Sequence, residues 1–313
     1  MRNIISDVNY DFMGKHRLAL IVSGILLVVS VLSIGIRGLN LGVDFTGGFT
    51  IEVGYDQAPD LNEIRSILAT ADLPDSQVQT FGASTEVLIR MAPKEGFTGA
   101  NVSTEVLRVL EQGSDSGISM RRVEFVGPQV GEELREKGGL AILAALFGII
   151  VYIWFRFEKK FSVGSVLALV HDVVITVGFF ALFQIEFDLT ILAALLAVIG
   201  YSLNDTIVVF DRIRENFVAM RSGTPAAVMN ESINQTLSRT VITSATTLLV
   251  LLSLFIFGGK IIHGFALALI LGVIIGTYSS IFVASITVLK LGITREDLMP
   301  VEKEGAEQPD SMP

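Results

Sequence analysis

Residues 18–36 read LALIVSGILLVVSVLSIGI, a run of nineteen residues that contains no charged side chain. A helix needs about 20 predominantly apolar residues to cross a bilayer, so this run is long enough to span one. Lys15 and Arg17 precede the run, as they would in a signal peptide. However, a signal core has roughly 7–15 apolar residues and a small-residue cleavage site after it, and neither feature is present. We therefore predict a retained transmembrane helix.

Five further apolar stretches predict that the chain crosses the membrane six times. They comprise residues 140–155, 161–183, 189–210, 240–257 and 261–289. The composition agrees, because 51% of the residues are hydrophobic, only 18% are charged and the mean hydropathy is +0.62. An average soluble domain has about 25% charged residues. The predicted fold class is therefore an all-α membrane bundle, in which residues 140–289 form the larger part.

Charge and cysteine content exclude several kinds of function. The net charge is −9, whereas a nucleic-acid-binding protein needs a basic surface. The chain contains no cysteine, so it offers no disulfide, no thiolate metal ligand and no thiol nucleophile. We expect neither a metal, nor a cofactor, nor enzymatic activity.

The distribution of Lys and Arg predicts how the bundle is oriented, because cytoplasmic loops have an excess of these residues. The two ends and the loops after the second and fourth helices together contain thirteen of them. The short loops on the opposite side contain only Lys260. Both ends, residues 1–17 and 290–313, are therefore predicted to be cytoplasmic, and residues 37–139 to lie outside.

Residues 37–139 contain the alternating short elements of a small α+β domain. Strands are expected at 50–55, 76–81, 86–91 and 118–126, with a turn at 82–85. Helices are expected at 60–71, where Asp60 and Glu63 form a capping signal, and at 101–111. The order βαββαβ predicts a ferredoxin-like domain. We interpret its charged residues as a solvated face, or as a surface that binds an extended chain or a partner subunit.

Asp205 lies inside the fourth predicted helix, in the segment 200–206 (GYSLNDT). A charge within a span costs several kcal/mol, which makes such a residue a functional candidate. In apolar surroundings this carboxyl group could bind and release a proton near neutral pH. Alternatively, it is a structural group that pairs with Asn204 or Ser202. Arg239 opens the fifth helix at a similar depth, where it either pairs with Asp205 or extends to the membrane surface.

Asp172 lies beside His171 near the middle of the third helix. Such a pair is compatible with a proton relay, although neighbouring residues of a helix point about 100° apart and need not share a partner. The alternative is that Asp172 forms hydrogen bonds to polar residues of adjacent helices. His263, near the outer end of the sixth helix, is interpreted as an ordinary interfacial residue.

Several motifs in one order resemble the SecD/SecF family of protein translocase subunits, within the resistance-nodulation-division (RND) superfamily. They are residues 42–48 (GVDFTGG), 171–172 (HD), 200–206 (GYSLNDT), 211–216 (DRIREN) and 235–240 (QTLSRT). The resemblance covers essentially the whole chain. It implies an RND-like half of six helices that pairs with a second half, SecD, and associates with the SecYEG channel and with YajC.

The same resemblance implies a function in the inner membrane. The complex would use the proton-motive force to promote the late, ATP-independent translocation and release of preproteins. Asp205 would be the proton-pathway acid, Arg239 its cationic partner and Asp172 a further member of the pathway. Asp44, with Gly47 and Gly48, would couple the periplasmic domain to the bundle.

Three other functions remain open at this point. One is half of a small-molecule efflux transporter, although such pumps usually contain both halves in one chain. Another is a passive scaffold of an export channel. The third is an intramembrane aspartyl protease, but Asp172 follows His171 and Asp205 follows Asn204, which are not the sequence contexts of those enzymes.

Overall fold

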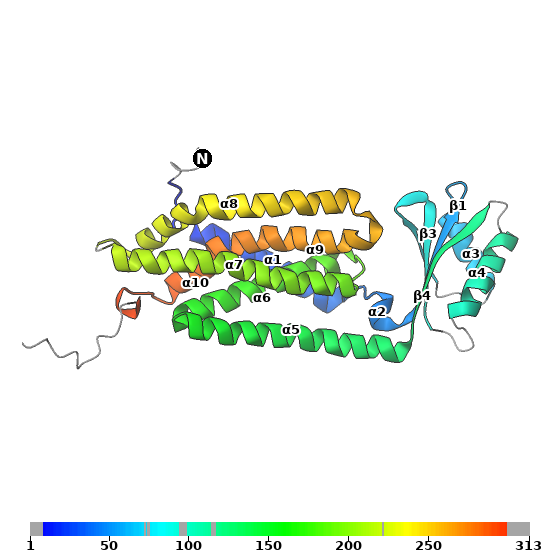
Figure 1. The fold of residues 1–313 in the computed structure, drawn as a ribbon, viewed down its shortest axis with the longest axis horizontal. Helices are drawn as coiled ribbons and strands as arrows, with labels where there is room; N and C mark the ends of the chain where they lie inside the picture. The colour runs from blue at the N-terminus through cyan, green and yellow to red at the C-terminus, as the bar shows by residue number, and fades with distance from the viewer. Residues whose placement is uncertain are drawn as a thin grey trace, which may run out of the picture.

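The computed structural model describes residues 9–71, 73, 76–93, 99–113, 117–220 and 222–298. Residues 1–8 and 299–313, which belong to the two predicted cytoplasmic ends, lie outside the described residues. Within the described parts, six helices are long and apolar enough to cross a membrane. They are α1 (His16–Arg37), α5 (Pro128–Arg156), α6 (Lys159–Phe183), α7 (Leu189–Ala219), α8 (Pro225–Phe257) and a last helix composed of α9 (Gly259–Ser279), the π-helical turn η1 (Ser280–Ala284) and α10 (Ser285–Lys290). Figure 1 shows them side by side, with a small domain at one end of the bundle.

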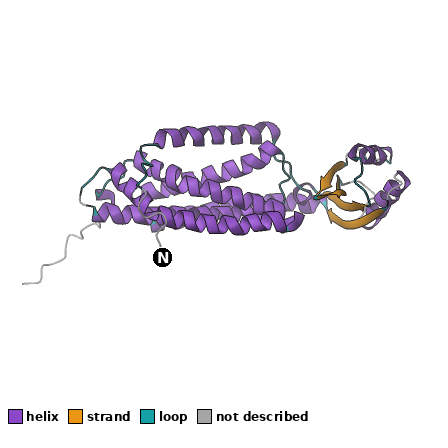
Figure 2. Ribbon diagram, turned by 90° about the horizontal axis from the view of Figure 1, so that it is seen from above, coloured by secondary structure: helices purple, strands orange, loops and turns teal. Residues whose placement is uncertain are grey.

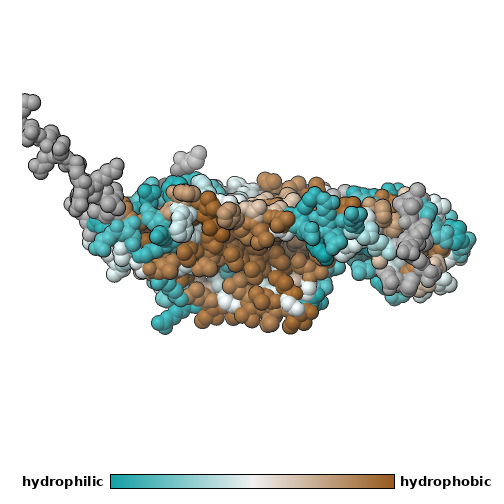
Figure 3. All heavy atoms as spheres, turned by 90° about the horizontal axis from the view of Figure 1, so that it is seen from below, coloured by the Kyte–Doolittle hydropathy of each residue, from teal (hydrophilic) through white to brown (hydrophobic). Residues whose placement is uncertain are grey.

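The bundle has a central layer and a periphery. About half of the most apolar part of α6 and of α7 is buried, whereas α1, α5 and α8 are mostly exposed. The exposed side chains are large and apolar, such as Phe147 on α5 and Leu249 on α8. Figure 3 shows a hydrophobic band across the middle of the bundle on the face in view, with hydrophilic residues toward both ends. This pattern is expected when lipid, rather than water, surrounds the helices.

The helices are longer than the apolar runs that predict them. α5 has Pro128 in its first turn, so the helix starts well before residue 140, where the predicted apolar stretch begins. Residues 128–139 read PQVGEELREKGG, which is too polar to signal a span, but proline is favoured at the first position of a helix. α7 likewise continues past residue 210, to Ala219, and α8 begins at Pro225, well before residue 240.

The small domain consists of β1 (Gly48–Tyr55), α3 (Leu61–Thr70), β2 (Gln77–Phe81), β3 (Ala83–Met91), α4 (Gly99–Gly113) and β4 (Ile118–Val126), in this order. The strands form one antiparallel sheet with the order β2-β3-β1-β4. The predicted turn at 82–85 is shorter than expected: only Gly82, at φ 79°, separates β2 from β3.

The sheet has one apolar and one polar face because side chains alternate along each strand. The apolar face forms a buried core with the two helices. This core includes Ile51 of β1, Val87 and Ile89 of β3, Leu68 of α3 and Val106 of α4. Both helices cover the face that lies away from the bundle, as Figure 2 shows from above. The opposite, polar face of the sheet is therefore turned toward the outer end of the bundle.

A short helix and two glycines connect the bundle to this sheet. α2 (Val43–Thr46) is followed by Gly47 at φ 70° and Gly48 at φ 130°, backbone conformations that favour glycine. A Cβ on Gly47 would lie 2.7 Å from the Cα of Pro128, and one on Gly48 would lie 2.4 Å from the carbonyl oxygen of Met91. The entry to the domain and the start of α5 therefore pack too closely for any side chain.

Candidate functional site

A cluster of polar side chains is buried in the centre of the bundle, around Asp172 of α6. Asp172 is 1% exposed, and both of its carboxylate oxygens accept hydrogen bonds. The hydroxyls of Ser202 on α7 and Ser279 on α9 donate to Oδ2 over 2.5 and 2.7 Å. The Nδ1 of His171 lies 2.8 Å from Oδ1. Contrary to one alternative from the sequence, Ser202 therefore pairs with Asp172 and not with Asp205.

Asp205 of α7 is also buried, at 5% exposure, but it has far fewer partners. The hydroxyl of Ser280 donates to its Oδ2 over 3.4 Å, which is a long hydrogen bond. The buried hydroxyl of Thr240, on α8, lies close enough to act on the same carboxylate, but it forms no hydrogen bond of ordinary geometry to any residue that the structure describes. The carboxyl group of Asp205 is thus shielded from solvent and weakly held.

Asp172 and Asp205 both accept hydrogen bonds from the same turn of the last helix. Ser279 donates to Asp172, and the next residue, Ser280, donates to Asp205. This turn leads into the π-helical segment η1, where the Ser285 hydroxyl donates to the Ser280 carbonyl. Single π-helical turns inside an α-helix occur frequently at functional sites. The sequence alone did not indicate the two serines, because no local pattern distinguishes them from packing residues.

Arg239 lies on the outside of the bundle, on α8. Among the described residues, no ion pair joins it to Asp205, although it is close enough for its charge to act on that carboxylate. The predicted pairing of these two residues therefore stays a prediction. An exposed guanidinium at the edge of a span would be stabilised by a partner subunit or by the membrane surface.

Asp44 connects α2 to the outer end of α7, the helix that contains Asp205. Its Oδ2 accepts a hydrogen bond from the backbone N–H of Leu189 over 3.1 Å. Asp188 caps the same helix by accepting from the N–H of Ile191 over 2.9 Å. The backbone of Phe187 is hydrogen-bonded to Asn40 and Gly42, just before α2. The start of α7 is therefore tied directly to the segment that leads into Gly47 and Gly48.

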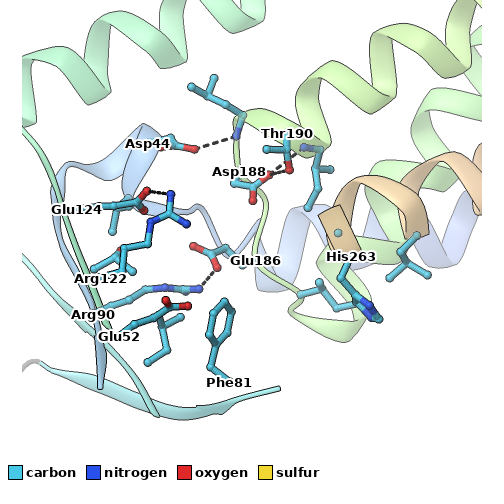
Figure 4. Close-up of a pocket in the computed structure, with 18 residues that line it drawn as sticks. Asp44, Glu52, Phe81, Arg90, Arg122, Glu124, Glu186, Asp188, Thr190 and His263 are labelled. Atoms are coloured by element: carbon cyan, nitrogen blue, oxygen red, sulfur yellow. Dashed lines mark hydrogen bonds and ion pairs between the residues drawn. The ribbon is translucent and has the colours of Figure 1, made fainter. Parts of the chain in front are cut away.

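An ion pair joins the polar face of the sheet to the loop between α6 and α7. The guanidinium of Arg90 on β3 contacts the carboxylate of Glu186 (Figure 4). Burial lowers the pKa of Arg90 from its usual range, and the charge of Asp188 opposes this effect. The Nε of Arg90 is buried, and no described residue forms a hydrogen bond with it. Nothing in the sequence signals this contact, since its partners are distant along the chain.

The ion pair borders a cavity of about 480 Å³ between the sheet and the bundle. Its sheet side includes Glu52, Arg122 and Glu124, and its bundle side includes Asp44 and His263. Figure 4 shows these side chains converging on the cavity from both sides. Among the described residues, no group of three or more histidine, aspartate or glutamate side chains is placed to bind a metal ion. The cavity is thus a charged junction between two parts of the molecule.

Comparisons with known proteins identify the family. Residues 106–294 match the family described as "Protein export membrane protein SecD/SecF, C-terminal", and residues 32–59 match the SecD/SecF GG motif. The chain belongs to the SecD/SecF family. The matched GG segment includes Gly47 and Gly48, whose conformations and contacts are described above.

Full-length relatives agree with this assignment. The protein translocase subunit SecF of Vibrio alginolyticus is 52% identical, with 98% of each chain covered. That of Escherichia coli O157:H7 is 49% identical, covering 97% of this chain and 95% of the relative. The chain is therefore a multi-pass protein of the inner membrane and a subunit of the protein-export machinery, not an enzyme.

Two solved structures of the longer protein SecDF have the same fold. A crystal structure of SecDF, a translocon-associated membrane protein from Thermus thermophilus, gives a TM-score of 0.84 at 37% identity over 92% of this chain. A structure of SecDF in a super-membrane-facing form gives 0.68 over 91%. This chain spans 39% of the length of either SecDF chain.

Proposed function

We propose that this subunit uses the proton-motive force to promote the late, ATP-independent translocation and release of preproteins. The observation that supports this most is the placement of Asp205. It is a buried and weakly held carboxyl group on α7, and the other end of the same helix is bound by Asp44 at the entry to the small domain. One helix therefore links a group that can change its charge to a domain that can move.

The proposed cycle begins when Asp205 binds a proton. Neutralisation weakens the attraction between Asp205 and Arg239, and it also changes the hydrogen bond from Ser280. α7 and the last helix then repack, and the change reaches the domain through Asp44 and the glycine pair. Asp172, held by Ser202 and Ser279, belongs to the same polar pathway.

The energy available is sufficient for such a cycle. Moving one elementary charge across a potential of 100 mV supplies about 2.3 kcal/mol. Because about 1.4 kcal/mol corresponds to a factor of ten, this shifts an equilibrium between two conformations by roughly forty-fold. A two-state packing of α7 against the last helix would respond to a change of this size.

The proposed arrangement places both ends of the chain in the cytoplasm and the domain from β1 to β4 in the periplasm. The excess of Lys and Arg on one side of the bundle supports this orientation. The element order and the antiparallel strand order β2-β3-β1-β4 support a ferredoxin-like domain. A periplasmic domain of this kind could hold an emerging chain and prevent its return.

SecD is the proposed direct partner, within an assembly that includes SecYEG, YajC and the translocating preprotein. This chain matches only 39% of the solved SecDF chain, so the remainder of that protein corresponds to a second component. Arg239 is exposed on α8, where a second bundle would cover it. A small-molecule efflux half or a passive scaffold would have the same span count, and only the scaffold would lack a proton flux.

Proton flux through the purified complex tests this function. The complex of this chain with SecD is reconstituted into liposomes, and proton uptake is followed with a pH-sensitive dye under an imposed potential. We expect Asp205→Asn to reduce uptake at least about tenfold, since a neutral amide cannot exchange a proton. The matched control is Asp211→Asn on the same helix, which loses only an exposed ion pair with Arg156 and should retain uptake. Unchanged uptake in Asp205→Asn would exclude this residue as the proton site.

A further inference from the structure

The side chain of His171 is buried in the membrane core and has one unused nitrogen. Its exposure is 3%, and its Nδ1 lies 2.8 Å from Asp172 Oδ1. Its Nε2 is buried and has no hydrogen-bond partner among the residues that the structure describes. Buried polar atoms are nearly always hydrogen-bonded, so an unpaired ring nitrogen at this depth needs a functional explanation.

The contacts of Asp172 determine the state of the imidazole. Oδ2 accepts the hydroxyls of Ser202 and Ser279, and Oδ1 faces His171. A carboxylate with donors on both oxygens acts purely as an acceptor. When Asp172 is ionised, its Oδ1 can only accept, so Nδ1 of His171 is the nitrogen that donates in this contact and Nε2 presents the free lone pair.

We propose that His171 Nε2 is a second proton-binding atom of this subunit, and that Asp172 positions and neutralises it. Binding of one solvent proton converts the imidazole into an imidazolium, whose positive charge faces the Asp172 carboxylate, and release of that proton restores the neutral ring. This inference rests on the proposed proton-driven function. It changes the expected role of Asp172 from a proton carrier to a positioning residue.

The groups around the His171 imidazole leave its Nε2 free to bind a proton. From α9, the ring of Tyr278 stacks on the imidazole with centroids 6.1 Å apart. The Tyr278 hydroxyl donates to the carbonyl of Ala19 and lies 3.0 Å from the hydroxyl of Ser23, both on α1. Tyr278 therefore has its own partners and leaves Nε2 free.

The cluster also connects to the first proton site. Ser279 and Ser280 are consecutive, and they bind Asp172 and Asp205 respectively. Among the described residues, the titratable groups around His171 are thus Asp172, Tyr278 and, through the two serines, Asp205, on which the charge of Arg239 acts. A change of charge at Asp205 alters the position of Ser280. Because Ser279 is the adjacent residue, its hydrogen bond to Asp172 changes as well.

Nitrogen NMR of the full-length chain in lipid nanodiscs tests the proposal. The chain contains three histidines, so ¹⁵N-histidine labelling with His16→Gln and His263→Gln leaves His171 as the only signal. We expect Nε2 to gain a proton between about pH 5 and 8, the range in which histidine commonly titrates. A ring that stays neutral over this whole range would overturn the proposal, and this measurement requires no change within the cluster.

Two variants of the labelled protein test whether Asp172 and Asp205 affect proton binding at His171 or only lie near it. Asp172→Asn removes the opposing charge, so we expect Nε2 to remain unprotonated over the same range. Asp205→Asn should change the pH at which Nε2 gains its proton, because it removes the charge that is connected to the cluster through Ser280 and Ser279. Asp211→Asn, at the membrane boundary, should leave the titration unchanged. Titration of Asp172→Asn that matches the parent would contradict the assigned role of Asp172.

The outcome is independent of the test of the proposed function. If Asp205→Asn abolishes proton uptake and His171 does not titrate, the proposed function stands and the second site is wrong. If His171 titrates but Asp205→Asn leaves proton uptake unchanged, the assignment of Asp205 as the proton site fails, whereas proton binding at His171 stands.

Discussion

At the scale of single residues, two buried aspartates of the same bundle have very different surroundings. Asp172 is satisfied by two hydroxyls and an imidazole, whereas Asp205 has one long hydrogen bond. Donors that stabilise a carboxylate make its protonation less favourable. The acid with fewer donors is the one whose charge can change during a cycle, which favours Asp205 as the exchanging group.

Sequence could identify these aspartates but not their partners. A charge inside an apolar run is visible without a structure, and so is an adjacent histidine. Ser279 and Ser280 lie about a hundred residues further along the chain from Asp172. The same helix contains other small residues, and nothing in the sequence distinguishes these two serines from them. Which serine faces which acid depends on the π-helical turn, and no propensity rule predicts its position.

Asp297 provides a residue-scale prediction about pH. Its carboxylate accepts from Lys160 over 2.6 Å and from the backbone and hydroxyl of Thr294 over 2.8 Å. These contacts, with that from Lys160 the largest, hold the pKa of Asp297 below its ordinary value. The contribution to stability is then complete above the ordinary pKa of an aspartate and is lost as the pH falls through the lowered value.

We therefore expect Asp297→Asn to destabilise the protein slightly at pH 7, by about 0.2–1 kcal/mol as for other exposed ion pairs. Thermal unfolding in detergent, compared with the parent from pH 7 to pH 3, provides the measurement. The difference between the two proteins should shrink as the pH falls. A difference that grows toward low pH would show that this carboxylate is not held in its charged form.

At the scale of elements, the entry to the domain is the most constrained segment. Gly47 and Gly48 adopt positive φ angles and pack against the backbone of Pro128 and Met91. The sequence shows the glycine pair, and the structure adds the reason for it, which is the close approach of α2, β1 and the start of α5. That approach was not predictable, because residues 128–139 carry no signal of a membrane helix.

Alanine at either glycine should be destabilising. A residue with a side chain in a sparsely populated conformation costs about 1–3 kcal/mol, and here the added Cβ also meets backbone atoms. We expect Gly47→Ala and Gly48→Ala to lower the unfolding temperature and to increase protease cleavage around the domain. The matched control is Gly127→Ala, where a Cβ has no neighbour within 4 Å and φ is −64°. Equal stability of all three variants would contradict the packing described here.

The contact between Arg90 and Glu186 makes a second prediction at this scale. We expect Arg90→Glu or Glu186→Arg to loosen the domain from the bundle, because each places two like charges in a partly buried site. The double exchange should restore the contact. Hydrogen exchange of β3 and of the α6–α7 loop measures this effect. Arg108→Glu, which disrupts an exposed pair on α4, is the control. Failure of the double exchange to restore protection would argue against a direct pairing.

At the scale of the whole molecule, the chain is an elongated bundle with a domain at one end (Figure 1). Apolar periodicity, charge distribution and turn signals were sufficient to predict six helices and an inserted α+β domain. They could not predict how the domain is seated, because that depends on contacts between residues far apart in the chain, such as Arg90 with Glu186 and Asp44 with Leu189. These contacts join the loop before α7 and the first residue of that helix to the segment that forms the domain.

The central claim is that a proton gradient, acting through Asp205, drives the late stage of export. The most direct measurement uses inverted membrane vesicles with a preprotein arrested partway, ATP removed, and either a proton or a sodium gradient imposed. We predict that the proton gradient completes translocation in the parent and in Asp211→Asn but not in Asp205→Asn, and that sodium alone has no effect. Equal completion by Asp205→Asn, or completion driven by sodium alone, would contradict the account.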